Sequence, residues 1–105
     1  MSQIPVATDK RYTPEELSPN TYYMRGDEKC YKLIHKTDKT VELYPNIISN
    51  IYRFEITNIK TGHIEVTDVI LNPAYHCFSD VNKNDIQNSI YELERHINNL
   101  KHITY

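Results

Sequence analysis

The chain has 105 residues and a mass of 12.4 kDa, which suits one small domain with a single modest core. An apolar content of 39% and a charged content of 25% are ordinary for a globular protein and argue against wholesale disorder. The formal net charge of −2 argues against a polybasic nucleic-acid binder, although it leaves room for a local basic patch.

Neither a membrane span nor secretion is expected from this sequence. No run approaches the roughly eighteen consecutive apolar residues of a membrane-spanning helix, and residues 1–10 lack the apolar core of a signal peptide. We therefore expect a cytoplasmic protein.

Residue usage gives an indication of origin. Ile, Asn, Lys and Tyr supply 40 of the 105 residues, whereas Ala and Gly occur twice each. Because the four favoured types have A/T-rich codons, we expect an A/T-rich source genome, such as that of a large DNA virus, a phage, or an A/T-rich bacterium or protist. For a viral protein, the expected location is the host cytoplasm or the virion.

Residues 1–20 are expected to form an N-terminal arm with one short helical turn. This segment holds three of the five prolines, and residues 1–12 look loosely held. Thr13 can cap a helix, Pro14 suits its first position, and Pro19 ends it after about one turn. The rest of the chain, residues 21–105, is expected to form a single domain.

Five β-strands are predicted between residues 21 and 71, where Tyr, Ile, Thr and Val recur at short spacing between turn residues. They span residues 21–24, 29–37, 40–44, 51–59 and 63–71.

The connection between the last two strands predicts a hairpin. Lys60-Thr61-Gly62 suits a three-residue loop with Gly62 in the left-handed conformation. This register places Phe54 opposite Asp68, and it leaves Asp68 on the apolar face, where a bulge or a charged partner would have to accommodate it. The residues predicted to share that face are Tyr52, Phe54, Ile56, Ile64, Val66 and Ile70.

The C-terminal segment changes to a helical period. Asn82 is a good N-cap for a helix over residues 83–102. The whole chain is therefore expected to be α+β, with an antiparallel five-stranded sheet or a small SH3-like open barrel followed by one long C-terminal helix. Apolar residues recur along the helix at spacings of 4, 3, 4 and 3, and we call them the helix seam: Ile86, Ile90, Leu93, Ile97 and Leu100.

The helix seam has two interpretations. It can cover the apolar face of the chain's own sheet, over Phe54, Ile56 and Val66, which is the interpretation we favour. Alternatively, its narrow spacing matches a coiled-coil seam and predicts self-association as a homodimer.

The sequence does not predict a catalytic, metal or cofactor site. With glycines only at 26 and 62, neither a P-loop nor a dinucleotide-binding loop can be built. The candidate zinc ligands lack the spacing of a zinc site, and they are Cys30, His35, His63, His76 and Cys77. No second carboxylate or base is fixed near Asp68. We therefore expect a protein that is not an enzyme.

A basic and aromatic hairpin over residues 22–39 is the most distinctive local feature. In such a hairpin the tyrosine rings can stack on bases while the neighbouring cations pair with phosphates. Alternatively, the tyrosine rings can form a cage for a cationic ligand. The same residues also suit a solvated strand face. We call six of them the tyrosine–lysine patch: Tyr22, Tyr23, Arg25, Tyr31, Lys32 and Lys36.

Together these features predict a non-enzymatic interaction or assembly module. It would bind a protein partner or a second copy of itself through the tyrosine–lysine patch or the helix seam. The alternative is a nucleic-acid-binding module that uses the hairpin over residues 22–39.

Overall fold

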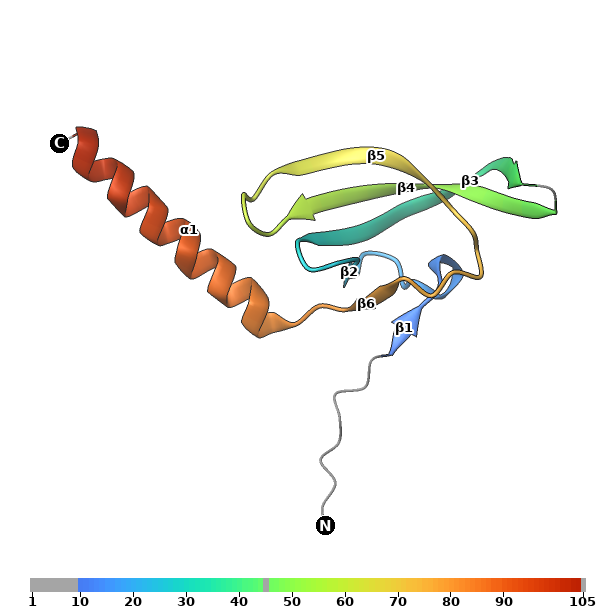
Figure 1. The fold of residues 1–105 in the computed structure, drawn as a ribbon, viewed down its shortest axis with the longest axis horizontal. Coiled ribbons are helices and arrows are strands. Elements are labelled where there is room, and N and C mark those ends of the chain that lie inside the picture. Colours follow the sequence, from blue (N-terminus) through green and yellow to red (C-terminus); the bar gives the residue numbers. More distant parts are fainter. Residues whose placement is uncertain (1–9, 45, 105) are drawn as a thin grey trace, which may run out of the picture.

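The computed structural model describes residues 10–44 and 46–104 as an open sheet followed by a long helix (Figure 1). The predicted combination of an antiparallel sheet and one long C-terminal helix is confirmed. The elements in chain order are β1 (Arg11–Tyr12), the 3₁₀ turn η1 (Pro14–Glu16), β2 (Tyr22–Met24), β3 (Lys29–Tyr44), β4 (Ile47–Asn58), β5 (Ile64–Leu71), β6 (Phe78–Asp80) and α1 (Lys83–Thr104).

The sheet has six strands rather than five, in the order β1-β6-β2-β3-β4-β5, and every neighbouring pair is antiparallel. Two predicted strands, residues 29–37 and 40–44, are parts of the single strand β3. An irregularity between Lys36 and Thr40 interrupts its pairing with β4, where the Thr37 hydroxyl donates a 2.7 Å hydrogen bond to the Ile51 carbonyl. The predicted break is therefore a bend within a strand.

The N-terminal segment joins the sheet and the core from Arg11 onward. β1 pairs with β6, and the buried side chain of Leu17 packs into the main core. The predicted helical turn is present as η1, where the Glu16 carboxylate accepts a 2.8 Å hydrogen bond from the backbone N–H of Thr13. The first nine residues of the expected arm lie outside the described residues.

Aromatic side chains fill the inner face of a strongly curved sheet. A flat sheet would separate β4 from β6 by about 14 Å, at roughly 4.8 Å per strand. Instead, the rings of Phe54 on β4 and Phe78 on β6 stack with centroids 5.6 Å apart. The Tyr31 ring meets both edge-on, at 5.3 Å and 5.5 Å. The sheet therefore curls around its own core, and Phe54 and Phe78 are completely buried.

β4 and β5 pair one residue away from the predicted register. Phe54 lies opposite Thr67, and Asp68 lies opposite Arg53. Because side chains alternate between the two faces of a sheet, the difference moves every affected β5 residue to the other face. Ile64, Val66 and Ile70, predicted to be inside, lie on the outer face and are 46–56% exposed.

A four-residue loop, rather than the predicted three-residue loop, causes the difference. The Asn58 side-chain oxygen accepts a 2.8 Å hydrogen bond from the backbone N–H of Lys60, which fixes the start of the turn. Gly62 adopts a φ of +77°, as predicted for this position. Ile59 leaves the ladder and packs against Cys30 in a second, smaller buried cluster. Burial of Ile59 therefore favours the longer loop.

The helix α1 does not cover the inner face of the sheet, so the favoured interpretation of the seam is wrong. Leu17, Tyr52, Leu71 and Phe78 pack around Phe54 instead. α1 touches the outer side of the sheet only near its start, and the rest of the helix extends past the β4–β5 turn (Figure 1).

The predicted N-cap of α1 is confirmed. The side-chain oxygen of Asn82 accepts a 2.9 Å hydrogen bond from the backbone N–H of Asn84, and the Asn82 carbonyl accepts bonds from Asp85 and Ile86. Lys101 and His102 lie in the last turn, where positive charge suits the negative end of the helix dipole.

Candidate interaction site

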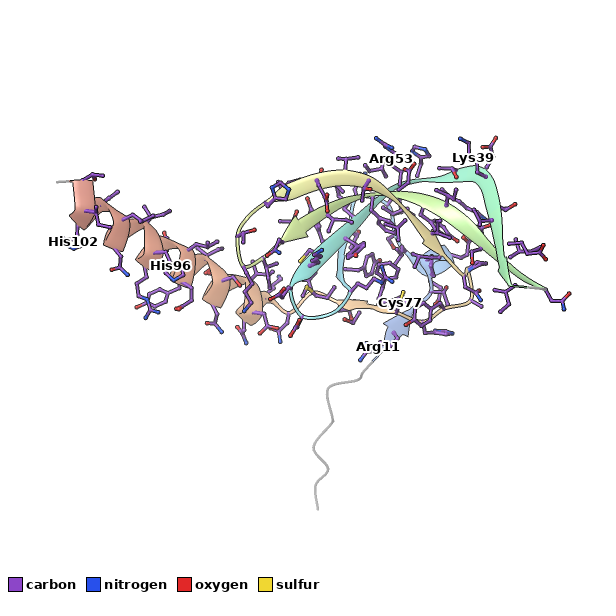
Figure 2. All side chains as sticks on the ribbon, turned by 45° about the horizontal axis from the view of Figure 1, so that its top comes forward. Arg11, Lys39, Arg53, Cys77, His96 and His102 are labelled. Carbon is purple, nitrogen blue, oxygen red and sulfur yellow. The ribbon has the colours of Figure 1, made fainter. Side chains whose placement is uncertain are left out.

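Asp68, anomalous in the predicted register, has a simple structural role. Its carboxylate lies 3.1 Å from the Arg53 guanidinium on the outer face, and both side chains are about half exposed. Figure 2 shows Arg53 on that side of the sheet.

We expect Asp68→Asn to lower the free energy of unfolding by less than about 1 kcal/mol, because exposed ion pairs are screened by water and salt. Urea unfolding at low and high salt measures this change. A loss above about 2 kcal/mol would contradict the outer placement of Asp68.

The structure does not bring the tyrosine–lysine patch together on one surface. Tyr23 and Tyr31 point into the core and are only 6% and 7% exposed. Tyr22 and Lys32 lie on the outer face, whereas Lys36 pairs with Glu15 at 3.2 Å. The two buried tyrosines cannot serve as stacking platforms in this conformation.

Tyr22 and Lys32, the two patch residues on the outer face, both contact the Glu55 carboxylate on β4. The Tyr22 hydroxyl donates a 2.6 Å hydrogen bond to Glu55, and the Lys32 ammonium lies 3.7 Å from the same carboxylate. That ammonium also lies 5.2 Å above the Tyr22 ring. The hydrogen bond to Glu55 raises the pKa of Tyr22, so its hydroxyl stays protonated at neutral pH. Much of the charge that could attract a phosphate is therefore neutralised within the sheet.

Arg25 is likewise engaged within the domain. Its guanidinium lies 5.6 Å from the Tyr31 ring and donates a 3.4 Å hydrogen bond to the Tyr31 hydroxyl. These contacts are typical of a cation that holds the end of β2 against the core.

The helix seam is a regular apolar surface whose distal half the described part of the fold leaves uncovered. Ile86 packs against the cluster of Met24, Cys30 and Ile59, and it anchors the first turn of α1. Further along, exposure rises to 43% at Ile90, 52% at Ile97 and 62% at Leu100. Figure 2 shows the distal half of α1, marked by His96 and His102, standing clear of the sheet.

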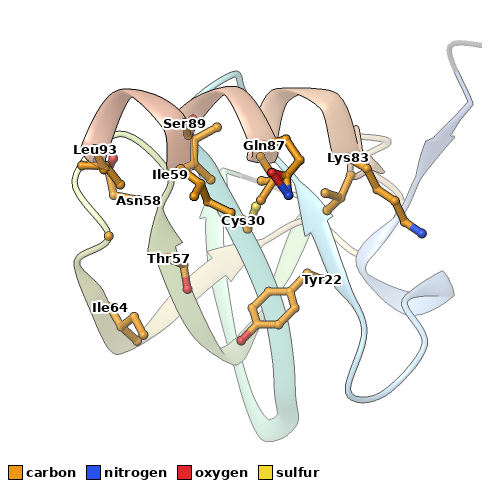
Figure 3. Close-up of a pocket in the computed structure, with 14 residues that line it drawn as sticks. Tyr22, Cys30, Thr57, Asn58, Ile59, Ile64, Lys83, Gln87, Ser89 and Leu93 are labelled. Carbon is orange, nitrogen blue, oxygen red and sulfur yellow. The ribbon is translucent and has the colours of Figure 1, made fainter. Parts of the chain in front are cut away.

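A groove of about 670 Å³ lies between the first half of α1 and the outer face of the sheet (Figure 3). We call it the helix groove. Ile90 and Leu93 form its helical wall, so the seam continues directly into it. Its other lining residues are mainly apolar: Tyr22, Cys30, Thr57, Asn58, Ile59, Gly62, Ile64, Val81, Lys83, Ile86, Gln87 and Ser89.

The two cysteines do not form a reactive or metal-binding centre. Burial raises the pKa of both thiols, Cys30 and Cys77, which keeps them protonated at neutral pH. The Cys30 Sγ lies 3.2 Å from the sulfur of Met24 inside the second cluster. Within residues 10–44 and 46–104, no three His, Cys, Asp or Glu side chains gather as metal ligands would.

Comparison of the chain with known protein families, with curated proteins and with solved structures returned no match. The part of the chain that the structure describes contains no helix both long and apolar enough to cross a membrane. The site is therefore interpreted from its own geometry.

The helix groove was missed at the level of sequence because its sheet wall depends on register. Ile64 lines the groove only because the four-residue loop turns it outward, and Ile59 because it leaves the ladder. The hydrogen-bonding capacity of Asn58 was the one local signal of that loop, since Asn side chains often bond the backbone two residues further on.

Proposed function

We propose that this protein is a non-enzymatic assembly module that forms a homodimer through the helix seam. The supporting observation is that Ile97 and Leu100, spaced as in a coiled coil, are more than half exposed on a helix that leaves the sheet. Burying an exposed aliphatic side chain releases about 25 cal/mol per Å² of apolar surface. A regular stripe of such side chains is typical of an interface.

A second copy is the partner that best fits the pattern. Ile90 and Ile97 occupy one core position of the heptad, and Leu93 and Leu100 occupy the other. Apolar side chains at these two positions are the ones that pack into holes between the side chains of a facing helix. The same stripe on both copies is self-complementary, as a two-fold symmetric interface requires.

Ile97→Asp should convert the dimer to a folded monomer. Ile97 is half exposed and lies beyond the contact with the sheet, so its loss spares the fold. Removing one half-buried isoleucine per copy costs roughly 2–3 kcal/mol of association, about 30- to 150-fold in dissociation constant. Size-exclusion chromatography with light scattering should give about 25 kDa for the wild type, twice 12.4 kDa, and about 12 kDa for the variant.

Asn98→Asp is the matched control, because it adds the same charge one residue away, about 100° around α1 and outside the seam. It should remain dimeric, and circular dichroism should show equal helix content in all three proteins. A monomeric wild type, or a dimer that Ile97→Asp leaves intact, would contradict the proposal.

The nucleic-acid alternative stays a prediction and can be checked on the same chromatogram. A monomeric peak with excess absorbance at 260 nm, lost on raising the salt concentration, would favour it.

A further inference from the structure

The helix groove is an apolar trough open along its length beside the seam. Ile59 forms its floor beneath Ser89, and Ile64 and Thr57 form the wall that faces α1 (Figure 3). Ile64 is 56% exposed although it is a β-branched aliphatic residue on a regular strand. An apolar trough that runs into an uncovered apolar stripe defines one continuous surface, which a single partner element can cover.

We propose that the helix groove holds the C-terminal turns of α1 from a second copy, so that two copies exchange antiparallel helices across a two-fold axis. This inference rests on the proposed function and specifies its geometry. Ile90 then packs against Leu100 of the second copy, and Leu93 against Ile97 of the second copy. Each groove receives the free end of the other helix.

The position of the sheet favours the antiparallel orientation. Over its first half, α1 already has its own sheet on the seam side, where Ile86 and Ser89 are covered. A parallel pair would bring both sheets to the same end, where they would compete for this space. An antiparallel pair keeps the two sheets at opposite ends of helices that are about 33 Å long, at roughly 1.5 Å per residue.

The groove has room for part of the free end of the helix. Taken as a cylinder about 10 Å wide, a helix occupies roughly 400 Å³ per 5.4 Å turn. The groove, at about 670 Å³, corresponds to about one and a half turns. The segment of α1 beyond Ile97 provides about two turns, ending at Thr104.

The end of α1 adds one more exposed apolar side chain to the same arrangement. Ile103 is 79% exposed, the highest value among the large apolar residues of the described chain. Ser89 is small and lines the groove. In an antiparallel pair with Ile90 against Leu100, Ile103 of the second copy falls within about one turn of Ser89. Because Ser89 is already buried beneath its own sheet, Ile103 would cover the rim of the groove.

Buried area also favours use of the groove. A buried aliphatic side chain corresponds to roughly 60–120 Å². Contact through only the two or three distal seam residues would cover less than about 400 Å² per copy, whereas stable dimers bury about 800 Å² per partner. Adding the groove brings about eight side chains per copy into the interface, or roughly 500–950 Å². Only the larger contact reaches the range of a stable dimer.

Disulfide trapping tests the orientation in the full-length protein. A copy carrying Ile90→Cys is mixed with a tagged copy carrying Leu100→Cys, both in a Cys30→Ala and Cys77→Ser background, and oxidised after exchange. We expect the mixed disulfide to predominate and Leu100→Cys to stay uncrosslinked when oxidised by itself. Efficient crosslinking of Leu100→Cys to its own copies would indicate a parallel pair and would overturn the inference.

Substitution in the groove separates this inference from the proposed function. Ile64→Asp should raise the dimer dissociation constant at least tenfold, whereas Val66→Asp, on the same strand and face but outside the groove, should change it less than threefold. If Ile64→Asp and Val66→Asp behave alike while Ile97→Asp still yields monomers, the helix pair stands and the groove exchange is overturned. A monomeric wild type overturns both proposals.

Discussion

Replacing Phe54 by alanine is expected to destabilise the protein by about 3–5 kcal/mol, the usual cost of deleting a buried aromatic side chain. Phe54 is completely buried, and its ring contacts Tyr31, Tyr52 and Phe78. It therefore links β3, β4 and β6 across the curved sheet. A domain of this size has a total stability of roughly 5–15 kcal/mol, so the substitution removes between about a fifth and all of it.

Urea unfolding followed by circular dichroism measures this effect. With a slope of about 1–1.5 kcal/mol per molar urea, the midpoint should fall by roughly 2–5 M. Val66→Ala is the control, because Val66 is 48% exposed on the outer face and should cost less than about 1 kcal/mol. A loss of 2 kcal/mol or more for Val66→Ala would instead support the predicted register, in which Val66 faces the core.

Local patterns predicted most of the elements and one helix boundary. The alternation of apolar and polar residues located β4 and β5, and Asn82 marked the start of α1. β1 and β6, of two and three residues, were missed. Their pairing depends on the curl of the sheet, which brings Phe78 onto Phe54. Such a long-range contact leaves no local mark in the sequence.

The register of β4 and β5 shows how burial of one side chain can set which side of the sheet the residues of a whole strand face. Gly62 is compatible with loops of three or four residues, so it could not fix the pairing. The longer loop buries Ile59 beside Cys30, and the outer placement of Asp68 beside Arg53 then follows. The predicted register had left Asp68 on an apolar face. A charged residue on a buried apolar face was the one feature of the sequence that indicated a wrong register.

The sequence predicted the helix seam of the candidate site but not which part of the seam is exposed. Periodicity identified the helix seam, but it describes one face of a helix and not what covers that face. The structure places Ile97 and Leu100 in solvent because the core closes without α1. Variants in the distal half of α1 can therefore be tested for assembly without the loss of fold that core variants cause.

Tyr52→Phe is expected to reveal a stabilising contact that is lost at high pH. Tyr52 is 1% exposed, and its hydroxyl donates a hydrogen bond to Glu15 in η1. Burial and this hydrogen bond raise the pKa of Tyr52 to about 12 from an ordinary value of 10.0. The same hydrogen bond lowers the pKa of Glu15. The pair therefore ties the N-terminal turn to the sheet with a neutral phenol and an ionised carboxylate.

The direction of the pH dependence follows from these two shifts. A raised pKa in the folded state stabilises the protein fully below pH 10, and the stabilisation is lost as the pH rises from 10 to about 12. At about 1.4 kcal/mol per unit, that loss amounts to roughly 2–3 kcal/mol. The lowered pKa of Glu15 acts at the acid end, where its contribution is lost as the pH falls below 4.5.

Urea unfolding of the wild type and Tyr52→Phe across pH 4–12 tests this linkage. At neutral pH the variant should be less stable by about 1 kcal/mol, the usual net value of one hydrogen bond. The difference should shrink above pH 10 and reverse before pH 12, because only the wild type must then ionise a buried phenol beside the Glu15 carboxylate. The other tyrosines titrate equally in both proteins and cancel in the comparison. A difference that stays constant from pH 7 to 12 would show that Tyr52 ionises as freely as an exposed tyrosine.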